Sequence, residues 1–192
     1  QFLAEAKDFG ILHLAIHGLP DLEEPNYAQL VFSKENDENE MLYNYEITDL
    51  ENKAQLAVLS ACETGVGKSL AGEGVMSLGR GFMYSGVPSV VMSLWKMNDQ
   101  TTSELVPDFY GYLSNGMRKD EALHQAKLDY LNNTTALNAY PFYWAGFVGI
   151  GDSQPLKKEK PVQWYWWLVG LPLIVLSGYA FYQISSNRFL AN

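Results

Sequence analysis

Four short apolar runs, each ending in small or polar residues, constrain the fold of this 192-residue chain more than any other feature. They cover Gly10–His17, Ala54–Cys62, Ser89–Trp95 and Phe147–Gly151. Runs of this kind are typical of parallel strands that are buried on both faces. The pattern therefore predicts an open, mostly parallel sheet.

The segments between these runs predict helices and one hairpin. Helical periodicity is found at Gly74–Tyr84, at Thr101–Leu113 with Asn98 or Asp99 as its N-cap, and at Lys119–Leu131. Gln29–Ser33 and Met41–Ile47 flank the acidic turn Lys34–Glu40, which predicts a β-hairpin inserted between the first two strands. Because strands and helices alternate, we expect an α/β domain over residues 1–151 with helices on both faces of the sheet.

The C-terminal part has a different character. Trp164–Ile184 lies within a charge-free stretch from Pro161 to Asn187. As a helix its 21 residues would cover roughly 31 Å, close to the thickness of a bilayer's hydrocarbon core. We expect one transmembrane helix over residues 164–184 in contact with lipid, after a polar linker (152–163) and before a short tail (185–192). A buried hairpin is the alternative.

Positive charge around this span favours one orientation. Lys157, Lys158 and Lys160 lie on its N-terminal side, and Arg188 lies beyond it. Because cytoplasmic flanks carry the excess of Lys and Arg, the bias predicts a single-pass membrane protein with a cytosolic domain.

Composition excludes several classes. The net charge is −9, and no Lys/Arg cluster is interleaved with aromatic residues, so nucleic acid is not an expected partner. The single cysteine excludes an intrachain disulfide and a four-thiolate zinc site. We expect no metal and no cofactor.

Two of the predicted strands end in residues capable of nucleophilic catalysis. Functional groups of open α/β sheets collect at the carboxyl ends of the strands, where His17-Gly18 and Cys62 would lie. A nearby histidine lowers the pKa of a thiol and later protonates the leaving amine. Backbone N–H groups of Gly18 and Cys62 would serve as an oxyanion hole. The pair predicts thiol catalysis, with Cys62 as nucleophile and His17 as base.

Five motifs occur in a fixed order along the chain. They are His13-Leu-Ala-Ile-His17-Gly18, Leu59-Ser-Ala-Cys62-Glu-Thr-Gly65, Gly72-Glu-Gly74, Ser93-Leu-Trp95 and Phe142-Tyr-Trp144-Ala-Gly-Phe147. Together they resemble the CHAT family of caspase-like cysteine peptidases through most of residues 10–151. The resemblance implies the His17/Cys62 dyad, a caspase-type sheet, and an endopeptidase that acts on protein substrates.

The resemblance has further implications. It implies an upstream tetratricopeptide-type region that controls activity, and first strands and helices that precede residue 10, so that the domain is N-terminally incomplete with an unpaired sheet edge. The caspase pattern Ala-Cys-x-Gly is one residue longer here, at Cys62-Glu-Thr-Gly65.

Individual residues have structural alternatives. Cys62 also fits a buried core thiol. His13 would share a strand face with His17, and we interpret it as a hydrogen-bonded core histidine, whereas His124 fits a helix surface. Asp99 and Glu73 are candidates for a pocket that reads a basic substrate residue, with helix capping as the alternative for Asp99.

Two other functions compete with the peptidase. Cys62-Glu-Thr-Gly-Val-Gly67-Lys68-Ser69 is similar to a phosphate-binding P-loop, but Cys62 replaces the first glycine. The glycines at 72 and 74 also disfavour the helix that should follow Ser69 directly. A catalytically inactive caspase fold that acts as a signalling scaffold is the second alternative.

Overall fold

The computed structural model describes residues 2–19, 21, 23–33, 39–60 and 71–157. The chain divides into two units, Gln1–Leu156 and Lys157–Asn192, and the elements below belong to the first. No helix among the described residues has the length and apolarity needed to cross a bilayer. The predicted span 164–184, the linker beyond Lys157 and the tail fall outside the described residues.

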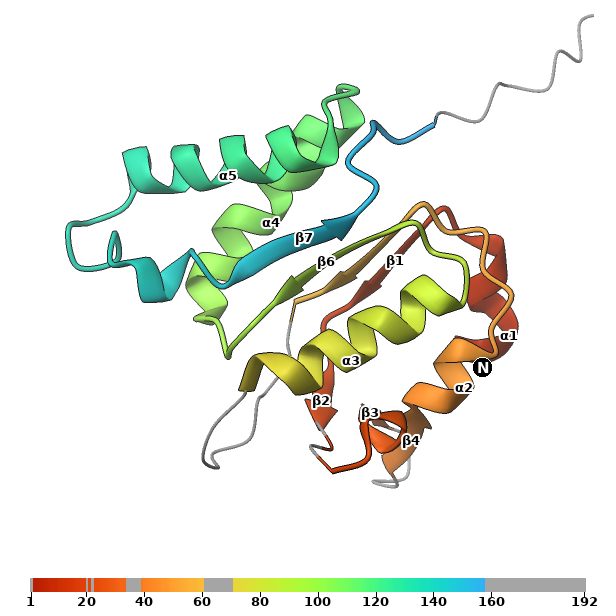
Figure 1. Ribbon diagram of the computed structural model, residues 1–192. Coiled ribbons are helices and arrows are strands. Elements are labelled where there is room, and N and C mark those ends of the chain that lie inside the picture. Colours follow the sequence, from red (N-terminus) through yellow and green to blue (C-terminus); the bar gives the residue numbers. More distant parts are fainter. Residues whose placement is uncertain (1, 20, 22, 34–38, 61–70, 158–192) are drawn as a thin grey trace, which may run out of the picture. The chain divides into compact units, whose positions relative to one another are not determined.

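A four-stranded sheet forms the centre of the domain (Figure 1). Its order is β1-β5-β6-β7, with β1 Ile11–Leu14, β5 Leu56–Leu59, β6 Ser89–Ser93 and β7 Phe147–Gly151. β1, β5 and β6 are parallel, which confirms the mostly parallel sheet. The expectation that Phe147–Gly151 is also parallel is wrong, because β7 pairs antiparallel with β6.

Helices cover both faces of this sheet, as expected. α3 (Ala71–Tyr84) packs Leu78 and Phe82 against Leu59 and Met92 on one face. On the other face, α4 (Asp99–Ser114) and α5 (Lys119–Asn133) pack against the sheet. β5 is buried at all four positions because helices cover it on both sides, which explains its continuous apolar sequence.

A second, antiparallel sheet is inserted between β1 and β5. Its order is β2-β3-β4, with β2 His17–Leu19, β3 Gln29–Ser33 and β4 Asn39–Tyr43. The predicted hairpin is confirmed for its first arm. Its second arm is strand only to Tyr43, because α2 (Asn44–Thr48) begins there and the Glu46 carboxylate accepts the Tyr43 N–H at 2.9 Å. The hairpin tip, residues 34–38, lies outside the described part.

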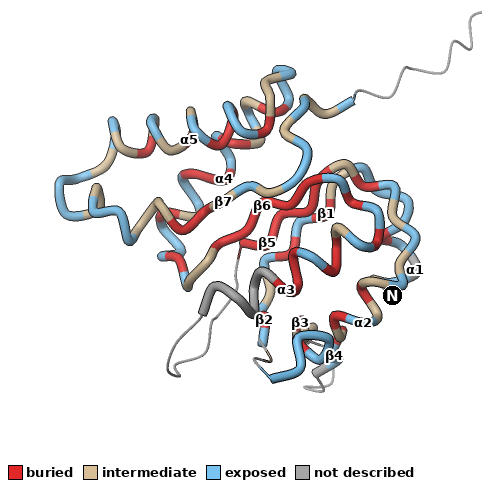
Figure 2. The backbone as a smooth tube through the Cα atoms, viewed as in Figure 1, coloured by how far each residue is buried: buried red, intermediate tan, exposed pale blue. Residues whose placement is uncertain are grey.

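Short helical segments complete the domain. They are α1 Phe2–Glu5, η1 Ala6–Asp8, η2 Pro25–Tyr27 and η3 Pro141–Tyr143. The predicted helices at Thr101–Leu113 and Lys119–Leu131 correspond to α4 and α5, each slightly longer than expected. Figure 2 shows that buried residues concentrate in the four-stranded sheet and on the inner sides of the helices.

Candidate functional site

His17 lies just beyond the carboxyl end of β1. The single strand expected over Gly10–His17 is wrong, because β1 ends at Leu14 and His17 begins β2 in the second sheet, opposite Val31. The expectation that His13 and His17 share one strand face fails for the same reason. His17 is exposed, so its imidazole is accessible at the edge where parallel strands end.

The register of the second sheet directs the Gly18 backbone away from β3. The Asn44 N–H donates to the Ala28 carbonyl at 2.7 Å. Because hydrogen-bonded pairs alternate along an antiparallel ladder, the backbone N–H and C=O groups of the even-numbered residues of β3 point toward β4. The backbone groups of Leu30, which is opposite Gly18, therefore point toward β4. The backbone N–H and C=O groups of β2 that bond to β3 belong to His17 and Leu19. The Gly18 N–H consequently points to the outer edge of β2.

The chain that leaves β5 runs beside the end of β1. The Ser60 N–H donates to the Leu14 carbonyl at 3.2 Å, which continues the β1–β5 ladder by one residue. Ser60 is the last described residue of this segment, two positions before Cys62. Cys62 itself, the predicted nucleophile and oxyanion donor, lies outside the described residues.

His13 connects β1 to this segment. Its Nε2 lies 2.9 Å from Ser60 Oγ, so the predicted hydrogen-bonded histidine is confirmed. The expected core position is wrong, because β1 is an edge strand and leaves His13 exposed on one side. Its ring contacts Tyr110 of α4 with centroids 5.6 Å apart, and this partial burial lowers the pKa of His13.

Tyr110 is a polar residue that sequence reasoning missed. Its hydroxyl is buried with no hydrogen-bond partner among the described residues, and burial raises the pKa of Tyr110 to about 12. No sequence signal could have found it, because Tyr110 occupies an ordinary position of an amphipathic helix.

The carboxyl end of β6 leads into α4. Asn98 is the N-cap, with its side chain accepting the Gln100 N–H at 2.8 Å, so the capping role proposed as an alternative for Asp99 is wrong. Asp99 is exposed in the first turn of α4. Glu73 lies at the start of α3, but its side chain is outside the described part.

The motifs around Trp95 and Phe142 form an aromatic wall at the same edge. Trp95 Nε1 donates to the Phe142 carbonyl at 2.8 Å, and the two rings stack with centroids 6.0 Å apart. Gly146 permits this packing, since a Cβ there would lie 2.6 Å from Met97 Sδ and 2.8 Å from Trp95 Cε2. The sequence showed these motifs without revealing that they pack together.

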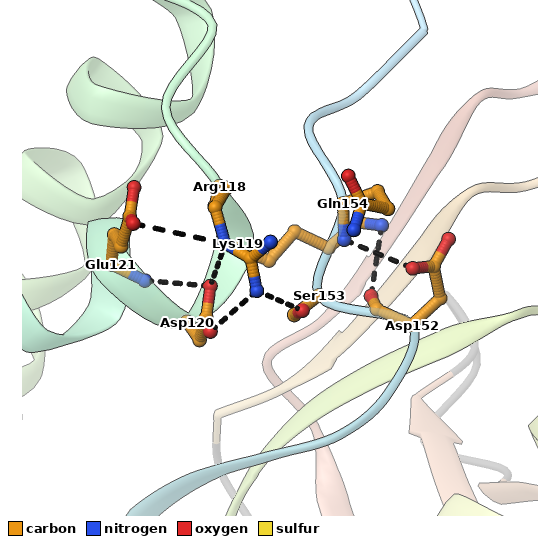
Figure 3. A network of polar contacts seen from close by, with 7 residues as sticks. All are labelled: Arg118, Lys119, Asp120, Glu121, Asp152, Ser153 and Gln154. Carbon is orange, nitrogen blue, oxygen red and sulfur yellow. Dashed lines mark hydrogen bonds and ion pairs between the residues drawn. The ribbon is translucent and has the colours of Figure 1, made fainter.

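A pocket of about 220 Å³ lies elsewhere, between α5 and β7. The buried Lys119 donates to the Asp152 carbonyl at 3.1 Å, and Arg118 contacts Asp120 and Ser153 (Figure 3). Asp152 lies beside Pro88, at the amino end of β6 and therefore at the opposite end of the sheet from His17. The exposed His124 also lines this pocket, as its predicted surface position implies. These contacts fasten α5 to the end of β7.

The alternative sites receive limited support. Within the described ranges, no three His, Cys, Asp or Glu side chains gather as metal ligands would. One argument against a P-loop is wrong, because α3 begins at Ala71 and includes both Gly72 and Gly74. The P-loop-like residues 62–69 lie outside the described part.

The fold and the site define an α/β domain with an accessible histidine-glycine pair at the carboxyl edge of its parallel strands. The CHAT domain model matches residues 1–152, and the chain belongs to this family. It is similar to tetratricopeptide repeat protein 28 from Homo sapiens, with 31% identity over 115 residues, and from Mus musculus, with 30% identity over 115 residues. Each match covers 60% of this chain, but only 4% of the human and 5% of the mouse protein.

Proposed function

We propose that this chain carries the catalytic part of a caspase-like cysteine endopeptidase that cleaves protein substrates. The observation that carries the proposal is the exposed His17, followed by a Gly18 N–H that points away from the β2–β3 ladder, in a member of the CHAT family. Ser60, two residues before Cys62, lies beside the end of the strand that leads to His17.

The proposed reaction uses these groups in two steps, acylation of Cys62 and hydrolysis of the thioester. The Cys62 thiolate attacks the carbonyl carbon of the scissile peptide bond, and the N–H groups of Gly18 and Cys62 stabilise the resulting oxyanion. The C–N bond then breaks as the His17 imidazolium protonates the leaving amine. A water molecule, deprotonated by His17, hydrolyses the thioester and regenerates the thiol.

The substrate pocket is proposed to accept a basic residue before the scissile bond. Asp99 supports this, because it is an exposed carboxylate in the first turn of α4, beyond the carboxyl end of β6. Glu73 is the second candidate. If a peptide library is cleaved equally well with and without Arg or Lys at that position, this assignment is contradicted.

The proposal extends to the whole protein. Both relatives are tetratricopeptide repeat proteins by name, which supports an upstream repeat region that controls the peptidase. Residues 164–184 are proposed to anchor the chain in a membrane with the domain in the cytosol. Protease shaving of intact cells tests this orientation: digestion of the domain from outside, without lysis, would reverse it.

A peptide electrophile that reacts with active-site thiols tests the catalytic assignment. The chain should be labelled at Cys62, and His17→Ala should slow labelling strongly, whereas His124→Ala, an exposed histidine at the opposite end of the sheet, should not. Cys62→Ala should abolish cleavage of candidate proteins by the full-length protein. Absence of labelling in the full-length protein would favour the inactive scaffold.

A further inference from the structure

The second sheet presents one of its faces to solvent beside His17. Gly18, Leu30 and Leu42 are buried, so side chains alternate between the core and the solvent along each strand. The opposite face, here called the outer face, consists of residues that are exposed or half-buried: His17, Leu19, Gln29, Val31, Met41 and Tyr43. The register places His17, Val31 and Met41 in one row and Leu19, Gln29 and Tyr43 in the next.

Three tyrosines extend this face. Tyr43 and Tyr45 stack with ring centroids 5.4 Å apart, and Tyr27 meets them edge-on at 6.4 and 6.0 Å. Tyr27 is 54% exposed and Tyr45 is 45% exposed. Exposed aromatic rings that gather in one place are typical of protein-binding surfaces.

Negative charge is concentrated in the same segment. Residues 21–51 contain ten acidic residues and one lysine, a net charge of −9 that equals the formal net charge of the whole chain. Among the described residues, no Lys or Arg pairs with Glu23, Glu24 or Asp49. Asp49 follows Tyr45 by one helical turn. Partial burial and then the Glu46 carboxylate raise the pKa of Tyr45.

We propose that the outer face and the tyrosine cluster (Tyr27, Tyr43 and Tyr45) bind a basic, extended segment of the protein substrate. The carboxylates of residues 21–51 attract Lys and Arg side chains of the substrate. The tyrosine rings bind the cationic groups by cation–π contacts, and Leu19 and Met41 pack against the aliphatic parts of the same side chains. This inference rests on the proposed peptidase. A second copy of the chain and an anionic membrane surface are disfavoured as occupants, because both carry negative charge.

The geometry also predicts where the basic segment lies relative to the cleaved bond. Tyr43 is two strands across and one row along from His17, which corresponds to roughly 12 Å between their Cα atoms. An extended peptide covers this distance in about three or four residues. We therefore expect Lys or Arg three to five residues from the scissile bond, in addition to any basic residue in the pocket.

Direct binding tests the proposal without requiring catalysis. The probe is a fluorescein-labelled 12-residue peptide with five Arg or Lys spaced by Gly and Ser, and its control has Gln at those five positions. Fluorescence polarisation is measured with the 192-residue chain carrying Cys62→Ala, in a non-ionic detergent. We expect the basic peptide to bind at least tenfold more tightly than the control and to weaken as salt rises from 50 to 300 mM.

Matched variants assign the binding to the tyrosines. Tyr27→Ser with Tyr45→Ser should weaken binding about tenfold, whereas Tyr27→Phe with Tyr45→Phe keeps the rings and should stay within twofold. Equal affinity for the two peptides, or equal affinity of the Ser and Phe variants, would overturn the proposal. Equal melting temperatures of the Ser and Phe pairs exclude a folding artefact in the Ser pair.

Labelling of Cys62 separates this proposal from the peptidase itself. In the Ser variant with Cys62 retained, the thiol-reactive electrophile should label at an unchanged rate. In the chain with its native tyrosines, labelling of Cys62 without preferential binding of the basic peptide overturns the docking surface alone. Tight binding of the basic peptide without labelling in the full-length protein overturns the peptidase alone.

Discussion

Replacing Gly146 by alanine should destabilise the domain at the aromatic wall. A Cβ there would lie 2.6 Å from Met97 Sδ, 2.8 Å from Trp95 Cε2 and 3.1 Å from Trp95 Cζ2. Trp95 cannot simply move away, because its Nε1–H bonds the Phe142 carbonyl and its ring stacks on Phe142. Overpacking of this kind costs about 1–3 kcal/mol, and we expect about 2 kcal/mol here.

Gly149 supplies the matched control from the same region of the chain. A Cβ there would meet Val91 Cγ2 at 3.7 Å and Leu123 Cδ2 at 4.0 Å, which are ordinary contacts. Gly149→Ala should therefore leave the free energy of unfolding unchanged or raise it by about 0.5–1 kcal/mol, since alanine restricts the unfolded chain.

Urea unfolding followed by tryptophan fluorescence compares the two variants. Gly146→Ala should lower the unfolding midpoint with an unchanged m value, and should lower the melting temperature by about 4–8 °C. Equal midpoints for Gly146→Ala and Gly149→Ala would refute the close packing of Trp95 and Met97 against Gly146.

Substitutions at three further positions test other parts of the domain. Tyr110→Phe removes a hydroxyl that is buried without a hydrogen-bond partner among the described residues, so it should not destabilise the domain. Because the pKa of Tyr110 in the folded state is raised to about 12, the wild type should lose stability as the pH rises from about 10 to 12. Urea midpoints measured at pH 8 and 11 should therefore fall less in the variant than in the wild type. Asn98→Ala removes the N-cap of α4 and should lower the free energy of unfolding by about 1 kcal/mol. Asn98→Asp keeps a capping oxygen and should retain most of the wild-type stability, which thermal unfolding of both variants would show. Burial lowers the pKa of His13, so the folded state binds this proton less readily than the unfolded state and loses stability as the pH falls below about 6.5. His13→Gln should reduce this loss, measured as the difference between urea midpoints at pH 7.5 and 5. An unchanged acid-side loss in His13→Gln would indicate that other groups cause it.

The fold followed from the sequence where local signals and burial agreed. The continuous apolar sequence of β5 predicted a strand covered on both sides, and the two capping candidates Asn98 and Asp99 marked the start of α4 to within two residues. The antiparallel direction of β7 was not predictable, because a buried strand has the same apolar pattern in either direction.

The errors near the site have local causes. The residues between Leu14 and His17 are as apolar as the strand they follow, so nothing in the sequence marked the transfer of the chain to a second sheet. Two glycines were expected to delay α3, but tertiary packing of the helix outweighs their propensity. The Glu46 cap that begins α2 was recognisable in principle, three residues after Tyr43.

The insertion of the second sheet between β1 and β5 affects the order in which the domain folds. In β3 and β4, Phe32 pairs with Glu40 only eight residues away, whereas Leu56 follows its partner Ile11 by 45 residues. Closing the longer loop costs more chain entropy, and pairings of this separation form slowly. A hairpin that forms first shortens the flexible part of that loop. The half of the site that contains His17 is therefore expected to form on local contacts, and the docking of β5 beside β1 to complete it afterwards.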